Sequence, residues 1–389
     1  MNKILTRSCA RITIVAIIFI AVVHEMMYST SAFVINSTQS SRKMCLHRRR
    51  LNSGSTKSRE FLFVRSMKAS TSLSKVHLVL DDLSTASLSL AGKDPDSAGK
   101  VNQDACFHFH ACENRFLCCG VLDGHGKKGH ELNSFLQSFL PKCLEEKLML
   151  VESTGMGIDK VLVETFEESH YAARMDTNVP AGRSGTTCVV TILDTNTATL
   201  YTGNVGDSRA IVGVQKLNED GSSDSQWGVK ALSQETTTSR EEERKRIEEG
   251  EGRIDSGGNV WYGPVGIAMT RALGDSVMAR AGVIPTPEVT QLCLSEEVQS
   301  EGSDEPYRCL VLLASDGIFD VMSNEDAIHF LDKTITNTET LDDTCAGLVQ
   351  EARDKWQAGL PLDVRIDDTS AVVTSFNFYA DARSNATSK

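Results

Sequence analysis

The sequence predicts an α+β fold in which pairs of helices cover stacked antiparallel sheets. The first observation is a series of short β-branched segments joined by turns, which is typical of antiparallel hairpins. These segments lie at 186–193, 199–205, 208–214 and 227–233. The second observation is that helical periodicity occurs in separate pairs of segments, whereas a parallel βαβ sheet would alternate helices with strands. A single domain at 76–380, of about 300 residues, is therefore expected.

Each remaining element is predicted from its local pattern. Residues 131–150 and 159–175 carry apolar side chains at helical spacing, so they are expected to form the first helix pair. The charged segment at 239–254 predicts a further helix that ends at Gly250 or Gly252. The other expected elements are a buried strand from residue 308 towards Asp316, helices at 324–332 and 342–358, and a closing strand at 367–378.

The charge of the chain is divided unevenly along its length. Residues 1–75 hold 13 basic and two acidic residues, whereas residues 76–389 hold 27 basic and 50 acidic residues, a net charge of −23. A nucleic-acid partner would require clustered cations, so this acidic body argues against one. The acidic surplus is compatible with bound divalent cations.

The first 32 residues are predicted to be a signal peptide or a signal anchor. Three basic residues precede the apolar run 12–23, which is the arrangement of a signal peptide that ends at Ala32. The run has twelve residues, fewer than the roughly 20 that a membrane-spanning helix requires, so the anchor is the second interpretation. Membrane contact is expected only if this run is retained.

Residues 33–75 have the composition of an organellar transit peptide, because they are rich in Ser, Thr and Arg and contain one acid. A signal peptide, a Ser-Ala-Phe junction at Phe33 and a basic stretch in series resemble the two-part leaders of plastid proteins in diatoms and related algae. This resemblance implies delivery to a plastid; the alternative is an endomembrane or membrane-anchored enzyme. Residues 381–389 are expected to form a disordered tail.

The eleven cysteines are expected to be reduced and mostly packed in the interior. None of the nine in the body occurs in a CxxC or Cys/His spacing suited to zinc. Cys188 and Cys309, for example, lie within apolar runs. The cysteines therefore predict packing and not a metal centre.

The stretch VLDGHGKKGH at 121–130, taken alone, is compatible with a solvated turn or with a metal site beside a proton donor. Acids interrupt the ends of apolar strands at Asp104, Asp123, Asp207, Asp316, Asp320, Asp367 and Asp368. A carboxylate in such a place is costly unless it is paired or binds a metal, and the obvious partners are Arg209, Arg271 and Arg365. Because Mg²⁺ and Mn²⁺ prefer oxygen ligands, the joint pattern favours a divalent-cation site.

Eight short motifs follow one another along the body. They are NQD at 102–104, DGHGKKGH at 123–130, SGTT at 184–187, GNVGDSRA at 203–210, IAMTRALGD at 267–275, GVIPTPEV at 282–289, ASDGIFDVMSNEDA at 314–327 and IDDTSAVV at 366–373. Together and in this order they resemble the metal-dependent protein serine/threonine phosphatases of the PP2C type. The resemblance covers roughly residues 85–378.

The resemblance implies a PP2C-like β-sandwich of two antiparallel sheets flanked by pairs of antiparallel helices, with the metals at one end. It implies at least two Mg²⁺ or Mn²⁺ ions per chain, with Asp123 as the ligand that bridges them. The other implied ligands are the carbonyl of Gly124 and the carboxylates of Asp316 and Asp367. Asp104 is implied either to bind a metal through a water molecule or to support the ligands without touching the metal. Asp207, Asp316 and Asp320 match a weaker third-metal site.

His125 matches the residue that protonates the leaving group, and Asp275 belongs to a motif that is expected to have a structural or supporting role. Two cations that share a water lower its pKa and neutralise the phosphoryl oxygens. Serine and threonine alkoxides are poor leaving groups, so an acid with the pKa of histidine is useful beside them. The expected partners are phosphorylated protein substrates, and a monomer is expected.

Three departures from the family pattern affect the surroundings of the site. Gln103 stands where many relatives carry Glu. Gly99 and Lys100 occupy the region of an arginine that holds substrate phosphate, so Lys100 is the candidate phosphate contact, a point charge without a bidentate grip. The sequence QETTT at 234–238 replaces Asp-His-Lys-Pro, which puts the geometry of the substrate loop in doubt.

Two functions from different classes remain open at this point. The first is an active phosphatase, and the alternative is a catalytically inactive relative that binds phosphoproteins as a scaffold. The presence of Asp123, His125, Asp316 and Asp367 favours the enzyme, because an inactive site has no need of unpaired carboxylates.

Overall fold

The computed structural model describes residues 77–95, 99–218, 223, 226–298, 306–358 and 365–379. The expected leader at 1–75 and the expected tail at 381–389 lie outside these residues. All described residues belong to one compact unit. Within the described ranges, no helix combines the length and the hydropathy needed to cross a membrane.

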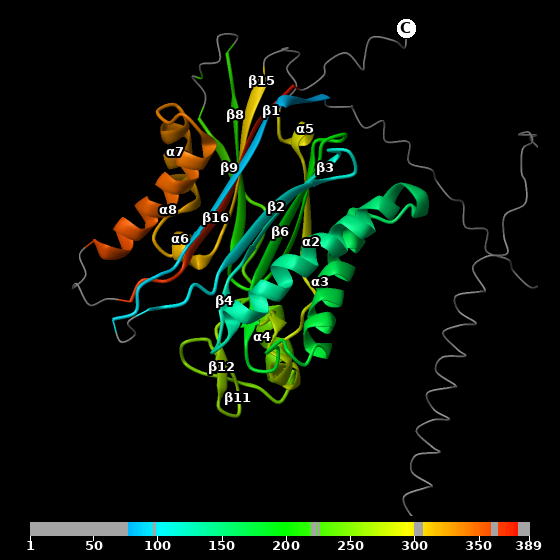
Figure 1. Ribbon diagram of the computed structural model, residues 1–389, viewed down its shortest axis with the longest axis vertical. Coiled ribbons are helices and arrows are strands. Elements are labelled where there is room, and N and C mark those ends of the chain that lie inside the picture. Colours follow the sequence, from blue (N-terminus) through cyan, green and yellow to red (C-terminus); the bar gives the residue numbers. More distant parts are fainter. Residues whose placement is uncertain are drawn as a thin grey trace, which may run out of the picture. The chain divides into compact units, whose positions relative to one another are not determined.

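The first of two large sheets has five antiparallel strands in the order β1-β16-β15-β8-β9 (Figure 1). Its strands are β1 (His77–Leu90), β16 (Thr369–Tyr379), β15 (Pro306–Ala314), β8 (Arg209–Lys216) and β9 (Gly228–Ala231). β1 and β16 come from opposite ends of the described chain. A bridge between Lys93 and Ile366 continues their pairing, so the segment that leads to Asp104 starts beside the segment that carries Asp367.

The second large sheet also has five antiparallel strands, in the order β14-β7-β6-β3-β2. Its strands are β14 (Glu288–Cys293), β7 (Thr199–Val205), β6 (Cys188–Asp194), β3 (Phe116–Leu122) and β2 (Ala105–Ala111). Every residue of β3 is buried because both faces of the strand are covered. Leu117, Cys119 and Val121 face the core between the sheets, and the alternate residues face the helices.

Two pairs of helices cover the outer faces of the sheets (Figure 1). α2 (Gly129–Thr154) and α3 (Ile158–Met175) pack on the second sheet, and the buried leucines of α2 recur every four residues, which is the spacing of one helix face. α7 (Asn324–Ile335) and α8 (Leu341–Gln357) pack on the first sheet. Ser323 and Thr340 cap these helices by accepting hydrogen bonds from backbone N–H groups of the first turn.

A small subdomain lies at one end of the sandwich, near β4 and the start of α2 (Figure 1). It contains α4 (Glu241–Glu249), β10 (Arg253–Ile254), β11 (Val260–Tyr262), β12 (Val265–Ile267) and the 3₁₀ helix η1 (Ser276–Ala281). Residues 253–269 are called the flap below. The subdomain has its own core, in which Ile247, Val260 and Met278 are fully buried.

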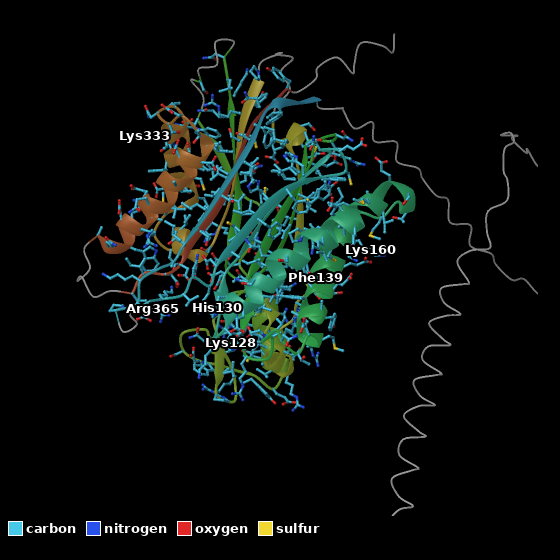
Figure 2. The ribbon with its side chains drawn as sticks, in the orientation of Figure 1. Lys128, His130, Phe139, Lys160, Lys333 and Arg365 are labelled. Atoms are coloured by element: carbon cyan, nitrogen blue, oxygen red, sulfur yellow. The ribbon has the colours of Figure 1, made fainter. Side chains whose placement is uncertain are left out.

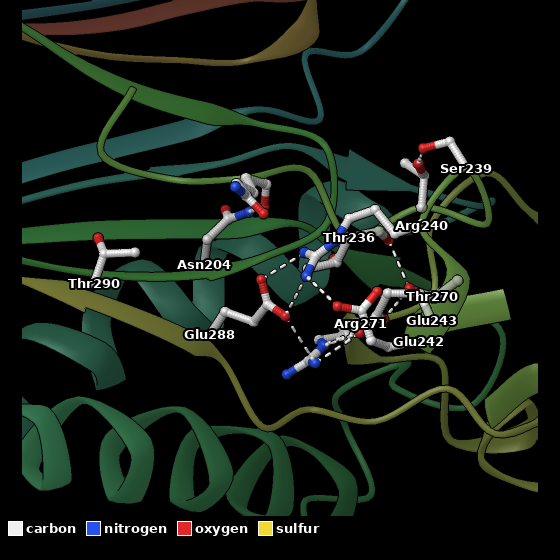
Figure 3. A network of polar contacts seen from close by, with 12 residues as sticks. Asn204, Thr236, Ser239, Arg240, Glu242, Glu243, Thr270, Arg271, Glu288 and Thr290 are labelled. Atoms are coloured by element: carbon white, nitrogen blue, oxygen red, sulfur yellow. Dashed lines mark hydrogen bonds and ion pairs between the residues drawn. The ribbon is translucent and has the colours of Figure 1, made fainter. Parts of the chain in front are cut away.

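An ion-pair network ties this subdomain to the second sheet (Figure 3). Glu243 of α4 accepts hydrogen bonds from Arg271, at 2.7 Å, and from Arg246, and it also contacts the hydroxyl of Thr270. Arg271 extends the network to Glu288 of β14, at 3.2 Å. Since Glu243 is fully buried, the two guanidinium groups hold its charge in place and fix the residues that follow the flap.

The predicted fold class is confirmed, and the differences from the prediction lie in elements with weak local signals. The helix pairs and the strands at 186–233 occur as expected, although α2 is longer than predicted and α4 ends at Glu249. Strand β1 and the flap strands were not predicted, because their hydrophobic pattern is short or irregular. The nine body cysteines are free, as expected. The other short elements are α5 (Leu294–Glu297), α6 (Asp316–Phe319), β4 (Gly124–His125), β5 (Gly185–Thr186) and β13 (Leu273–Gly274).

Candidate active site

A three-stranded sheet of very short strands, in the order β13-β5-β4, brings His125 and Asp275 together. His125 pairs with Gly185 of β5, and Gly185 pairs with Gly274 on its other side. His125 Nε2 lies 2.5 Å from Asp275 Oδ2. A Cβ atom on Gly185 would lie 2.1 Å from Asp275 Oδ2 and 2.5 Å from His125 Nε2. Glycine at 185 is therefore a steric requirement of this pair.

In the pair between His125 and Asp275, the carboxylate is buried and the imidazole is half-buried. Asp275 is 2% exposed, and a fully buried carboxylate needs a partner of opposite charge. Burial lowers the pKa of His125, but the charge and hydrogen bond of Asp275 oppose this effect, and the net pKa is raised. The carboxylate of Asp275 therefore favours the protonated form of His125.

The strand ends place four predicted carboxylates at the same end of the sandwich. Asp104 precedes β2, Asp123 joins β3 to β4, and Asp316 begins α6 directly after β15. Asp367 stands two residues before β16. The backbone of Asp123 is fixed by Thr187, whose Oγ1 accepts from Asp123 N at 3.0 Å and whose N donates to Asp123 O at 2.9 Å.

The carboxyl groups of Asp104 and Asp316 lie near Asp123, close enough for their charges to act on it. Burial raises the pKa of Asp104 to about 7, and the charge of Asp368 contributes. Burial and the charges of Asp207 and Asp367 raise the pKa of Asp316 to about 7. Burial raises the pKa of Asp123 well above its ordinary value. This end of the sandwich therefore concentrates negative charge, of which Lys100 neutralises only a part.

None of the three candidate arginines pairs with the carboxylate cluster among the described residues, and the third, Arg365, is exposed and makes no hydrogen bond or ion pair there. Arg209 hydrogen-bonds Asn324 at 2.8 Å and pairs with Glu235, while Arg271 pairs with Glu243 and Glu288. Within the described ranges, no three or more His, Cys, Asp or Glu side chains are already arranged around a point that would hold a metal ion.

Two described residues already contact oxygens of the acids. Lys100 Nζ lies 2.8 Å from Asp367 Oδ1 and 3.1 Å from Asp368 Oδ1. Ser315 Oγ donates to Asp104 Oδ2 at 2.9 Å. Lys100, the predicted phosphate contact, is thus placed against a predicted metal ligand.

The residues nevertheless fit a divalent-cation site by their chemistry. Among the described residues, Asp104 Oδ1 and Asp316 Oδ1 are buried oxygens that receive no hydrogen bond. Buried oxygens without a donor in a surplus of negative charge are what a hard divalent cation satisfies. The donor set of carboxylates and a backbone carbonyl, without sulfur or imidazole, suits Mg²⁺ or Mn²⁺ better than zinc.

The two third-metal candidates lie at the margin of this cluster. Asp207 is in the turn from β7 to β8, and its pKa is raised by burial and by the charges of Glu235 and Asp320. Asp320 ends α6, and burial and Glu235 raise its pKa as well. Glu235 comes from the QETTT segment and was not predicted to lie near the site. The sequence did contain an indication of its importance, because Glu235 is the acid in the segment that departs from the family pattern.

The two glycines of the motif DGHG serve different purposes. Gly126 has φ of 81°, a backbone conformation that residues with a Cβ rarely adopt. Gly124 needs space instead, because a Cβ there would lie 2.5 Å from the carbonyl oxygen of Gln103. The two interpretations of VLDGHGKKGH, a turn and a metal site beside a proton donor, are therefore compatible with each other. A tight turn places Asp123 and His125 on either side of Gly124.

Several supporting residues were missed by sequence reasoning. Ser315, Ser370 and Ser89 form a chain of contacts behind Asp104, in which Ser370 N donates to Ser315 Oγ at 3.1 Å and the hydroxyls of Ser370 and Ser89 lie 2.7 Å apart. Trp356 Nε1 donates to the carbonyl of Gly317 at 2.8 Å and so fixes the residue after Asp316. Asp275 was noted but not assigned to the site, because nothing local in the sequence shows that it reaches His125.

A cleft of about 750 Å³ opens beside His125 and Asp275. Its walls are the turn 126–128 before α2, the loop 180–184 before β5, and the end of the flap at 264–269. Figure 2 shows Lys128 and His130 at the start of α2, above the flap hairpin. The cleft is therefore positioned so that a substrate can reach His125.

Comparison with known proteins identifies the class to which this fold and site belong. A sequence model described as "Protein phosphatase 2C" matches residues 100–357. "Probable protein phosphatase 2C 34" of Arabidopsis thaliana is 29% identical over 301 residues, which cover 71% of this chain and 77% of that relative. "Probable protein phosphatase 2C 48" of Oryza sativa subsp. japonica is 28% identical over 305 residues, 71% of this chain and 80% of that relative.

The fold of the chain is also similar to that of solved structures. The crystal structure of serine-threonine phosphatase 2C from Toxoplasma gondii superposes with a TM-score of 0.59 at 16% identity, covering 76% of this chain and 95% of that one. This superposition shows that the chain has the fold of that structure. The chain belongs to the protein phosphatase 2C family. At the level of the family it is a protein phosphatase, a hydrolase of phosphorylated proteins.

Proposed function

We propose that the chain is an active protein serine/threonine phosphatase that hydrolyses phosphoserine and phosphothreonine. The observation that carries this proposal is the His125–Asp275 pair, held 2.5 Å apart beside a cluster of carboxyl groups whose charges act on Asp123. Buried charges of this kind are costly to the fold, and functional sites are where such costs are found. A scaffold that only binds phosphoproteins has no use for a buried proton donor.

The carboxyl groups are proposed to hold at least two Mg²⁺ or Mn²⁺ ions. Asp123 would contribute to both, and the remaining contacts would come from the Gly124 carbonyl, Asp316, Asp367 and Asp104. Bound cations would supply an activated water and neutralise the charge of the phosphoryl group. Asp207 and Asp320 are proposed to hold a third ion more weakly, because they lie at the margin of the cluster.

His125 is proposed to donate its proton to the leaving serine or threonine oxygen. The carboxylate of Asp275 keeps the imidazole charged and fixes the orientation of the ring. Gly185 leaves the space in which the two side chains meet. Lys100 remains the proposed phosphate contact, and its hold on Asp367 is one that a bound cation would compete with.

The experiment that tests this function is hydrolysis of a phosphothreonine peptide and of p-nitrophenyl phosphate by the purified chain with Mn²⁺ or Mg²⁺. Turnover that a chelator abolishes and that Asp316→Asn reduces by at least a hundredfold supports the proposal. Turnover that is insensitive to both changes contradicts the metal mechanism. A folded chain that binds the peptide without hydrolysing it supports the alternative, an inactive scaffold.

We also propose that residues 1–75 deliver the enzyme to a plastid. The proposal rests on the order of an apolar run, the junction at Phe33 and a basic, Ser-rich stretch. A fluorescent protein fused after residue 75 should accumulate in plastids of an algal host. Fluorescence confined to the secretory membranes would support the alternative of an endomembrane or membrane-anchored enzyme.

A further inference from the structure

The cleft beside His125 has an uneven distribution of charge and hydrophobicity. Its volume is about 750 Å³, which exceeds what the phosphorylated side chain alone would occupy. Apolar residues form the flap wall and part of the loop wall: Pro180, Pro264, Val265, Ile267, Ala268 and Met269. Basic residues from the turn 126–128 and the loop 180–184 also line it: Lys127, Lys128 and Arg183. The cleft therefore offers both cationic and apolar groups to a ligand.

Two of the three cations in the cleft are free to bind a ligand. Lys128 pairs with Glu131 of α2 at 3.0 Å. Lys127 and Arg183 are exposed, and neither makes a hydrogen bond or ion pair within the described part of the chain. The backbone around them is close-packed, because a Cβ on Gly126 would lie 2.7 Å from the carbonyl oxygen of Arg183. The two turns that carry the cations thus contact each other, and the cations border the same opening.

The position of His125 decides which part of a substrate lies in this cleft. His125 lines the cleft and is separated in the chain from Asp123 only by Gly124, so it lies beside both the carboxylate cluster and the cleft. A general acid contacts the leaving oxygen, which in a phosphoprotein belongs to the serine or threonine and not to the phosphoryl group. The polypeptide that carries this residue must therefore occupy the side of His125 on which the cleft opens.

We propose that the cleft selects phosphoproteins in which the phosphoresidue is flanked by acidic and apolar side chains. Lys127 and Arg183 contact the acidic side chain, and the flap wall at Val265 and Met269 packs against the apolar one. The inference rests on the proposed phosphatase activity and names its substrate class. In a body with a net charge of −23, a local pair of unpaired cations is a discriminating feature, because acidic peptides are repelled elsewhere on the surface.

The experiment compares kcat/KM for two phosphothreonine peptides that differ only in their flanks, one with glutamates and one with lysines. We expect the unaltered chain to favour the acidic peptide by about tenfold, the effect of two partly exposed charge pairs. The double variant Lys127→Glu, Arg183→Glu should reverse this preference, and the neutral variant Lys127→Gln, Arg183→Gln should reduce the ratio towards one. Each peptide also carries a leucine as its apolar flanking residue. A third peptide, in which this leucine is replaced by asparagine, should lose affinity if the apolar wall is used.

Lys142→Glu is the matched control. Lys142 is an exposed lysine of α2, about 20 Å along the helix from Lys128 at 1.5 Å per residue, so reversing its charge should leave the ratio unchanged. Using the ratio of two peptides cancels any effect of a variant on the chemical step. A ratio that stays at the unaltered value in the double variant, while hydrolysis continues, overturns the inference and leaves the phosphatase proposal standing.

Two further outcomes are distinguishable. If charge reversal lowers kcat/KM equally for both peptides and for p-nitrophenyl phosphate, the cations contact the phosphoryl group itself, and the inference is wrong. If the chain hydrolyses no substrate, the phosphatase proposal fails, and fluorescence anisotropy with the labelled acidic peptide tests the cleft alone. Binding that the double variant abolishes supports the cleft, and absence of binding to the unaltered chain overturns it.

Discussion

The side chain of His125 lies 2.5 Å from Asp275, measured between Nε2 and Oδ2, although 150 residues separate the two in the chain. The pair is possible because a strand of two residues, β5, stands between the strands that carry them and presents glycine at the point of contact. Asp275 itself adopts a left-handed conformation, with φ of 43°, which is uncommon for a residue other than glycine. Strain of this kind is retained where the surrounding structure enforces it, and functional sites are common places for it.

Asp275→Asn is expected to reduce turnover of a phosphothreonine peptide by about a hundredfold, because the imidazolium of His125 loses its carboxylate partner. Turnover of p-nitrophenyl phosphate should fall much less, since that leaving group needs little protonation. His125→Ala should show the same selectivity, and the double variant should be no worse than either single variant. A series of aryl and alkyl phosphates measures this dependence.

The control for this prediction is Asp332→Asn on α7, where the carboxylate is partly exposed and pairs with Arg308 at 3.7 Å. It should leave both substrates unaffected. Equal losses on peptide and aryl phosphate in Asp275→Asn would show that Asp275 supports the fold and not the proton transfer.

Gly185→Ala is expected to separate His125 from Asp275, since the new Cβ would lie 2.1 Å from a carboxylate oxygen that cannot easily move in a buried site. The cost to folding should be about 1–3 kcal/mol, as for other overpacked interiors, and activity should resemble that of Asp275→Asn. Urea unfolding and peptide turnover check the two effects separately.

Gly347→Ala provides the comparison, because the nearest side-chain atoms to its Cβ, in Phe330, lie at an ordinary 3.6 Å and the residue is inside α8. Alanine there should leave activity unchanged and stabilise the helix by about 0.5–1 kcal/mol. Full activity of Gly185→Ala would contradict the steric argument.

Divalent cations are expected to raise the melting temperature of the chain at pH 7.5. The carboxyls of Asp104, Asp123 and Asp316 repel one another in the folded state, and a cation that binds only the folded state adds about 2.7 kcal/mol when it is present at about 100-fold its dissociation constant. Asp316→Asn should raise the melting temperature in the presence of chelator, because one repelling charge is removed, and should diminish the response to Mn²⁺. Differential scanning fluorimetry measures both.

The pH dependence of the chelated protein follows from the same groups. The pKa values of Asp104 and Asp316 are about 7 in the folded state, against an ordinary value of 3.8. Between pH 3.8 and pH 7 the folded state therefore binds more protons than the unfolded state. Stability without cations should therefore fall as the pH rises from about 4 to about 7. A flat profile in this range, or a lower melting temperature for Asp316→Asn in chelator, would count against the carboxylate cluster.

Glu243 is expected to contribute stability with the opposite pH dependence. Burial raises its pKa, but Arg246 and Arg271 lower it to about 2 from 4.5. The contribution is therefore complete above pH 4.5 and is lost as the pH falls towards 2; a shift of this size corresponds to about 3 kcal/mol. Glu243→Gln should lower the free energy of unfolding by that order at pH 7, and the difference from the unaltered chain should shrink as the pH is lowered.

Glu242→Gln is the matched control for this prediction, since Glu242 is the preceding residue of α4 and its side chain is 76% exposed. It should change the free energy of unfolding by a few tenths of a kcal/mol at most. Urea denaturation of the three proteins at several pH values compares them. A pH-independent difference for Glu243→Gln would show that packing, and not the ion pairs of Figure 3, accounts for its effect.

The sequence by itself determined the elements whose signals are local. Apolar residues at helical spacing located α2, α3 and α8, and β-branched runs located β6, β7 and β8, because periodicity is set by which face of an element is buried. The acids at strand ends and the order of the motifs also indicated a carboxylate-rich site at one end of a sandwich. The helix-flanked sheets confirm this fold class.

Only the tertiary structure decided which side chains meet. Asp275 reaches His125, Lys100 reaches Asp367, and Glu235 approaches Asp207, through pairings between strands and loops that are distant in the chain. These contacts depend on electrostatics and on close packing at glycine, which have no period along the sequence. The cleft, too, is formed by three segments that adjoin only after folding. Local pattern therefore specifies the elements, whereas the chemistry of the site depends on the distances that their packing sets.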